Sequence, residues 1–282
     1  MDSRTRTITV AAGIVLIAAV IASGETKKEL RFPVGRKAMV SISNEYGPIS
    51  VKPNAGREVV ITFTTYSDKV DVAQSQRGNR INVTAYPKAG ADAQTGRVDF
   101  EVLVPADASM TLRTNSGSLH VERLHGDVSL EETAGDVDVR DFSGAHVHIK
   151  TLDSPIMLTN VHDGHVDITS VDGSIVLNAV SGPLVQVNST SGNIQYDGDF
   201  GAGGEYLLSS HTGNIDAIAP SYASIDVVAS SVNGQVINDF TLQPERVPFI
   251  SRAGSAFAGT MNKAASQVKL LSFSGRIHLK KR

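Results

Sequence analysis

The chain has 282 residues and a formal net charge of −3 at pH 7, and it contains no cysteine and no tryptophan. Without cysteine it forms no disulfide and no thiolate metal site, and it has no cysteine nucleophile. With 26 basic and 29 acidic residues there is no strongly basic surface, so a nucleic-acid partner is not expected. The length is sufficient to bury a sizeable hydrophobic core.

Residues 1–24 are predicted to be a signal peptide or an N-terminal membrane anchor. Arg4 and Arg6 form a basic segment, and the 15 residues 8–22 (ITVAAGIVLIAAVIA) are apolar apart from Thr9. A full membrane span needs roughly 20 apolar residues, so the segment favours a signal peptide cleaved after Ala22 over an uncleaved tether. Both alternatives export the body of the protein to the periplasm or the cell surface, and the second anchors it in the membrane.

Residues 25–112 are predicted to be an irregular, β-rich N-terminal part. The ranges 38–44, 58–66, 80–85 and 97–104 alternate apolar and polar residues or are rich in β-branched residues, as strands are. Gly47 is followed two residues later by Ile49, a spacing that recurs through the rest of the chain. We therefore expect this part to begin the same stack as the regular repeats of residues 113–282.

The regular part repeats one short unit, which is defined by an anchor glycine. Successive anchors are 18 or 19 residues apart at first and 21 later, a spacing typical of solenoid proteins. An aliphatic residue stands two positions after each anchor, and a residue that is Ser or Thr in all units but one stands three positions before it. The anchors are Gly117, Gly135, Ser154 (in place of glycine), Gly173, Gly192, Gly213, Gly234 and Gly275; the residues three positions earlier are Thr114, Glu132, Thr151, Ser170, Ser189, Ser210, Ser231 and Ser272.

Each unit holds two short strands, for example residues 137–139 and 147–149, joined by turns. A second glycine divides the early units, at Gly126, Gly144, Gly164 and Gly182, and we expect the glycines to supply the positive φ of tight turns. One such unit cannot bury its apolar side, whereas units stacked about 4.8 Å apart can. The sequence therefore predicts an all-β fold, a single-stack β-solenoid (β-helix) with 19–21 residues and two short strands per coil. Residues 251–254 are interpreted as a degraded repeat between Gly234 and Gly275.

Two longer runs resemble a known family. Residues 98–117 lead from an extended strand through Pro105 into the repeats, and residues 267–279 close the chain with Ser-Gly-Arg-Ile. They are similar to the bacterial "putative adhesin" β-solenoid family, a domain of unknown function, and the similarity extends over about residues 30–280. The resemblance implies an exported or membrane-tethered repeat domain that is not an enzyme and has no catalytic residues and no cofactor.

Four polar residues of adjacent units are candidate metal ligands. In the predicted register His146 and His165 are neighbours, and His148 lies beside Asp167, all on the outer face of the stack. Ladder neighbours roughly 5 Å apart could bind a divalent metal ion or respond to acid. A metal site usually needs further ligands held by a second shell, so a polar outer face is the favoured interpretation.

Acidic residues are the candidates for catalysis. Asp136 and Asp138 are predicted to share an outer face, and Asp127, Asp163, Asp172 and Glu131 lie at or near turns. Paired carboxylates on a solenoid face could cleave polysaccharide. However, most of these acids stand where turns favour Asp, and the nearby Arg140 and Lys150 are not clearly in register with them. Turn formation and solubility are therefore the favoured roles.

These observations favour an exported, non-catalytic module that binds an unknown envelope or surface macromolecule, or serves as a scaffold. Two alternatives stay open, namely a solenoid enzyme that degrades polysaccharide and a domain that senses an envelope ligand. An enzyme should have a groove with clustered acids and a base, whereas a scaffold should have a plain polar face.

Overall fold

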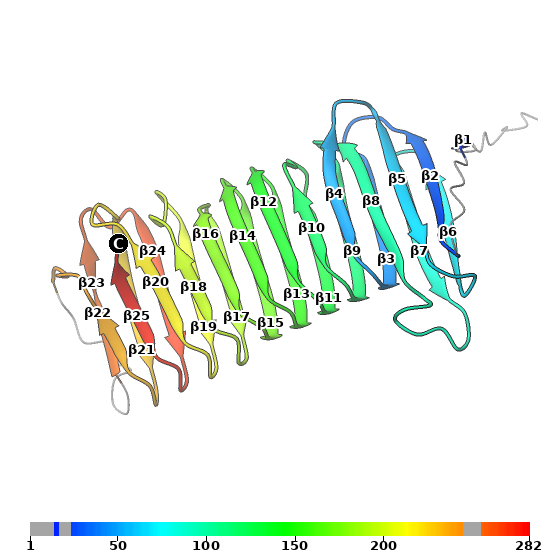
Figure 1. Ribbon diagram of the computed structural model, residues 1–282. Coiled ribbons are helices and arrows are strands. Elements are labelled where there is room, and N and C mark those ends of the chain that lie inside the picture. The colour runs from blue at the N-terminus through cyan, green and yellow to red at the C-terminus, as the bar shows by residue number, and fades with distance from the viewer. Residues whose placement is uncertain (1–13, 17–23, 245–254) are drawn as a thin grey trace, which may run out of the picture.

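The structure is a computed structural model that describes residues 14–16, 24–244 and 255–282. These residues form strands and no helix, and the strands build one elongated stack of two layers (Figure 1). The predicted all-β solenoid with two short strands per coil is confirmed. Within the described ranges there is accordingly no apolar helix of membrane-spanning length.

The first layer, sheet A, contains thirteen of the described strands. In spatial order they are β1 (Ile14–Leu16), β2 (Thr26–Pro33), β5 (Glu58–Thr65), β8 (Val98–Pro105), β4 (Ile49–Asn54), β10 (Leu119–Glu122), β12 (Val137–Ser143), β14 (Ile156–His162), β16 (Ile175–Val180), β18 (Ile194–Asp197), β20 (Ile215–Ala219), β25 (Ile277–Lys281) and β22 (Val236–Asn238). Most of the apolar segment 8–22 lies outside the described residues, but β1 pairs antiparallel with β2, which the sequence did not lead us to expect.

The second layer, sheet B, contains twelve of the described strands. In spatial order they are β23 (Ser255–Met261), β21 (Ile225–Ser231), β24 (Ser266–Ser272), β19 (Glu205–Ser210), β17 (Leu184–Ser189), β15 (His165–Asp172), β13 (His146–Asp153), β11 (Val128–Ala134), β9 (Ser109–Ser116), β3 (Met39–Tyr46), β7 (Arg80–Pro87) and β6 (Val70–Arg77). From β9 to β20 the chain alternates between the two sheets, so each coil contributes one strand to each.

The core lies between the sheets and consists of aliphatic residues stacked in register. Neighbouring coils pair in parallel, so that Ile156, Ile175 and Ile194 are successive partners in sheet A, and all three are buried. Inward and outward residues alternate along each strand, as the period of two requires. Gly47 and Ile49 continue the same rows, because β4 pairs with β10 and β3 pairs with β9. β3 and β4 of the N-terminal part therefore belong to the same stack.

The order of coils at the two ends of the stack differs from the order in the sequence. The last coil, β24 and β25, lies between β19–β20 and β21–β22 and pairs in parallel with both. Gly275 thus stacks between Gly213 and Gly234. The predicted degraded repeat at residues 251–254 lies outside the described residues. At the other end, β3 and β4 lie between β7–β8 and β9–β10 in the same way.

Antiparallel strands occupy both ends of the stack. In sheet A, β5 pairs antiparallel with β8 and with β2, and in sheet B, β6 pairs antiparallel with β7. At the opposite end β23 pairs antiparallel with β21. These additional strands cover coils that would otherwise expose a complete parallel edge.

Close packing of the backbone, rather than positive φ, explains most of the anchor glycines. Only Gly117 and Gly173 among the repeat anchors have a positive φ. At Gly192, by contrast, a Cβ atom would collide with the carbonyl oxygen of Gly173 in the preceding coil, and the same holds at Gly213 and Gly275 with their neighbours. The predicted positive φ is therefore wrong for most anchors.

In the second row of glycines the predicted positive φ is confirmed at Gly144 and is wrong at Gly126, Gly164 and Gly182. Gly126, Gly164 and Gly182 each pack against a carbonyl group of the preceding coil, but a Cβ on Gly144 would meet no atom within 4 Å. Ala145 takes this place in the row, since Gly164 packs against its carbonyl oxygen. Gly144 instead has a φ of 67° and forms the turn beside it.

Ile175 and its neighbour Ser174 test the register of the stack. Ile175→Asp would place a carboxylate in the aliphatic core, so we expect a loss of several kcal/mol in the free energy of unfolding. Ser174→Asp changes an exposed residue and should cost no more than about 0.5 kcal/mol. Equilibrium denaturation of both variants measures the difference. The opposite ranking would mean that the register is shifted by one residue.

Candidate functional site

A row of buried polar side chains follows the anchor corner through the stack. In spatial order its members are Asn44, Thr114, Glu132, Thr151, Ser170, Ser189, Ser210, Ser272 and Ser231, and all of them are buried. Ser210 is typical: its Oγ accepts a hydrogen bond from the Gly213 N–H (3.0 Å) and donates one to the carbonyl oxygen of Gly192 in the preceding coil (3.0 Å). Thr151, Ser231 and Ser272 also donate hydrogen bonds to a neighbouring coil, so these hydroxyl groups tie adjacent coils together.

Glu132 is the acidic side chain in this row. It contacts Ser154, which stands at an anchor position in place of glycine. Ser154, which replaces glycine, donates a hydrogen bond from its Oγ to Glu132 Oε2. The other carboxyl oxygen, Oε1, has no partner, and neither have the adjacent Thr114 Oγ1 and Asn44 Oδ1. Burial raises the pKa of Glu132 from 4.5 to about 7, because the charged form loses its hydration.

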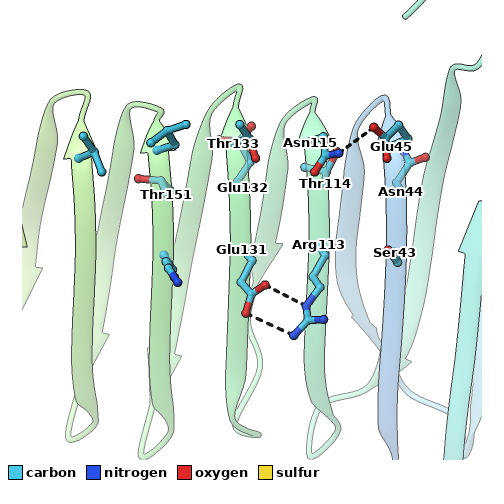
Figure 2. Close-up of a pocket in the computed structure, with 13 residues that line it drawn as sticks. Ser43, Asn44, Glu45, Arg113, Thr114, Asn115, Glu131, Glu132, Thr133 and Thr151 are labelled. Carbon is cyan, nitrogen blue, oxygen red and sulfur yellow. Dashed lines mark hydrogen bonds and ion pairs between the residues drawn. The ribbon is translucent and has the colours of Figure 1, made fainter. Parts of the chain in front are cut away.

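A groove runs across the outer face of sheet B above this part of the row. It has a volume of about 350 Å³ and crosses β3, β9, β11, β13 and β15 (Figure 2). Arg113 forms an ion pair with Glu131 (Nε to Oε2, 3.0 Å), and Asn115 donates a hydrogen bond from Nδ2 to Glu45 Oε1 (2.7 Å). Its outward-facing lining comprises Ser43, Glu45, Arg113, Asn115, Glu131, Thr133, Lys150, Leu152 and Val171.

The chemistry of this groove suits a polar ligand of low net charge. Its two outward carboxylates, of Glu45 and Glu131, are both engaged by other side chains. Two cations, Arg113 and Lys150, balance them. Leu152 and Val171 add exposed apolar surface at one end. The groove was not found from the sequence, although the outward positions of neighbouring strands in the predicted register would have placed these residues side by side.

A second polar cluster lies on the outer face of sheet A. Asp138 accepts hydrogen bonds from Arg140 Nε (2.9 Å) and contacts His120 Nδ1 through its other oxygen (3.0 Å). His120 Nε2 lies 3.5 Å from Glu122 Oε2. The sequence-based view that Arg140 is not in register with the acids is therefore wrong, since Arg140 and Asp138 share one face of β12. Asp136 is exposed in the turn before that strand.

The remaining acidic candidates do not converge on one point. Asp127 accepts a hydrogen bond from the His146 N–H (3.0 Å), and Asp172 accepts one from the Gly173 N–H (2.8 Å). Asp163 has a φ of 56°, a conformation that Asp tolerates in turns. Asp172 and Asp163 thus serve the turns in which they stand, and Asp127 links its turn to the next coil.

The histidine candidates lie where the register placed them, as two separate pairs. His146 and His165 are partners on β13 and β15, and their rings stack with centroids 4.7 Å apart and planes 10° apart. His148 Nδ1 lies 3.1 Å from Asp167 Oδ2. In the described part of the chain, no three His, Asp or Glu side chains are arranged to hold a metal ion.

Together, these features define a two-sheet β-solenoid repeat protein. Over residues 23–280 the sequence matches the family described as Toastrack DUF4097, and the chain belongs to that family. This confirms the resemblance inferred from the two sequence runs. No curated protein matches the chain.

Two solved structures are similar to it. One is a putative adhesin from Bacteroides fragilis, with a TM-score of 0.49 and 12% identity over 93% of this chain and 98% of that chain. The other is a putative cell adhesion protein from Clostridium sporogenes, with a TM-score of 0.31 and 12% identity over 91% of this chain and 100% of that chain.

The stacked histidines lead to a prediction about metal binding. The purified protein should take up no stoichiometric zinc or nickel, because stacked rings do not direct two nitrogens at one ion and no third ligand is close by. Equilibrium dialysis followed by metal analysis measures this. Tight uptake of one ion per chain that disappears in His146→Ala, but not in a His211→Ala control, would contradict the prediction.

Proposed function

We propose that this protein is an exported, non-catalytic surface module that holds an extended polar polymer of the cell envelope, a polysaccharide, in the groove on sheet B. The groove is the observation on which the proposal depends. The groove is lined by polar side chains and has apolar residues at one end. Its hydroxyl, amide and charged groups come from four adjacent strands. Because coils repeat about every 4.8 Å, such a surface presents similar groups at regular intervals to a ligand that is itself a repeating chain.

The state of the carboxylates supports binding rather than hydrolysis. Glycoside hydrolysis requires one carboxyl group that donates a proton and a second that acts as base or nucleophile. In the groove Glu131 forms a bidentate ion pair with Arg113, and Glu45 accepts a hydrogen bond from Asn115. Both outward carboxylates are therefore already used to order the lining. The third carboxyl group that lines the groove, that of Glu132, is buried and accepts a hydrogen bond from Ser154. Carbohydrate hydroxyl groups can bond to the polar atoms that remain.

Arg113 and Arg140 form a matched pair for testing the groove. Both are exposed arginines that pair with a carboxylate, but they lie on opposite sheets. Arg113→Ala combined with Asn115→Ala should weaken binding of the host's purified surface polysaccharide at least tenfold, whereas Arg140→Ala should leave it unchanged. Isothermal titration measures both affinities. Equal affinities in the two variants, or no binding by the wild type, would contradict the proposed site, and release of new reducing ends would favour the enzyme alternative.

Export is tested separately through the apolar segment. Residues 1–24 fused to a reporter enzyme that is active only outside the cytoplasm should give activity, because the segment of residues 8–22 directs export. Leu16→Arg in the fusion should abolish it, since a charge at the centre of such a segment costs about 3 kcal/mol on insertion. Full-length native protein recovered from the cytosol of its host would argue against export.

A further inference from the structure

Glu132 takes the place that a serine hydroxyl occupies in other coils. A Cβ placed on Gly213 would lie against the carbonyl group of Gly192 and 2.7 Å from Ser210 Oγ. A Cβ placed on Gly135 would lie against the carbonyl group of Gly117 and likewise 2.7 Å from Glu132 Oε1. Glu132 Oε1 therefore lies beside Gly135 and the carbonyl group of Gly117, just as Ser210 Oγ lies beside Gly213 and the carbonyl group of Gly192.

A serine in this place donates a proton, which a carboxylate cannot do. Ser210, Ser231 and Ser272 each donate a hydrogen bond from Oγ to the carbonyl oxygen of the preceding anchor in the stack. The Ser154 hydroxyl and the backbone N–H of Ala134 favour the ionised form of Glu132, but burial outweighs them. An ionised Glu132 would also set the negative charge of Oε1 beside such a carbonyl oxygen. A protonated Glu132 supplies the missing O–H, while its other oxygen accepts the hydrogen bond from Ser154. The unpartnered Oε1 is thus the atom that requires a proton.

The charges around Glu132 also favour the neutral acid. Asp136, in the turn after β11, and Asp153, at the end of β13, both disfavour a further negative charge nearby. The basic groups of the adjacent strands, Arg113 on β9 and Lys150 on β13, lie at outward positions, and Arg113 is paired with Glu131. The inward-facing residues of the opposite strands β10, β12 and β14 are apolar. No described cation therefore compensates a buried carboxylate here.

We propose that Glu132 and Ser154 form a buried proton-binding site, and that loss of its proton weakens the contact between the β11–β12 and β13–β14 coils. The inference concerns the stability of the stack. Glu132 also lines the groove, but the inference does not rest on a ligand there. The inference also gives one reason for both departures from the repeat, namely Glu132 in place of Ser or Thr and Ser154 in place of glycine. Ser154 donates a hydrogen bond to Glu132 in the preceding coil.

The sign of the pH dependence follows from the raised pKa. Below pH 4.5 Glu132 is protonated in both folded and unfolded chains, and its contribution to stability is complete. As the pH rises from 4.5 to about 7, the unfolded chain loses this proton while the folded chain keeps it, so stability falls. Above about pH 7 both forms are ionised, and the loss is complete and constant.

Glu132→Gln removes the titration and keeps the shape of the side chain. Relative to this variant, the unfolding equilibrium constant of the wild type should rise by about a hundredfold between pH 4.5 and pH 7.5. Both proteins contain the same histidines, so the titration of the histidines cancels when their unfolding equilibrium constants are compared at each pH. Glu131→Gln, the adjacent outward residue, is the matched control and should leave the slope of the wild type unchanged. In difference infrared spectra at pH 6, the carbonyl stretch of a protonated carboxylic acid should be present in the wild type and absent in Glu132→Gln.

A double variant keeps the test decisive if Glu132→Gln fails to fold. Glu132→Ser with Ser154→Gly restores the common pattern of the repeat, and it should fold and lack the pH slope of the wild type between pH 4.5 and 7.5. A slope that persists in either variant would overturn the proposal. So would a wild type that is stabilised by added calcium or sodium at pH 8 while Glu132→Gln is not, because a cation would then compensate an ionised Glu132.

Discussion

The whole stack depends on how closely the backbones of adjacent coils approach at the anchor corner. There a glycine Cα packs against the carbonyl group of the preceding anchor with no room for a side chain. The buried hydroxyl row beside it satisfies the polar groups that this contact removes from water. Parallel pairing of the strands and the thin aliphatic core both follow from this spacing, since each requires every coil to repeat the position of the one before.

The repeat could be predicted from the sequence because its rules are local. The distance from an anchor to its aliphatic residue and to its serine is the same in every coil, so two sheets and an interior follow from counting. The order of the coils is not local information. Gly213, Gly234 and Gly275 carry the same pattern, and nothing near them specifies that the third lies between the first two. Similarly, Gly144 matched the spacing of its row, but Ala145 fills the position.

The candidate sites show the same division between local and non-local information. His146 and His165 could be placed as neighbours from the period alone, and the structure stacks them. Glu132 and Ser154 were visible as separate departures from the repeat, but their hydrogen bond joins two coils and depends on which side-chain rotamers fit. The groove depends on outward residues of five strands. Such residues follow no rule of burial, so no periodic pattern marks them.

The position of the last coil bears on how the protein reaches and keeps its fold. A solenoid with sequential coils can fray from its ends, because each terminal unit has one neighbour only. Here β24 and β25 have a paired coil on each side, so a segment that follows β21 and β22 in the sequence becomes an interior layer of the stack. Until it arrives, β21 and β22 lack the surface on which they stack. Assembly of this end is therefore a concerted closure between distant parts of the chain, which is slow for topological reasons and, once complete, resists unravelling strand by strand.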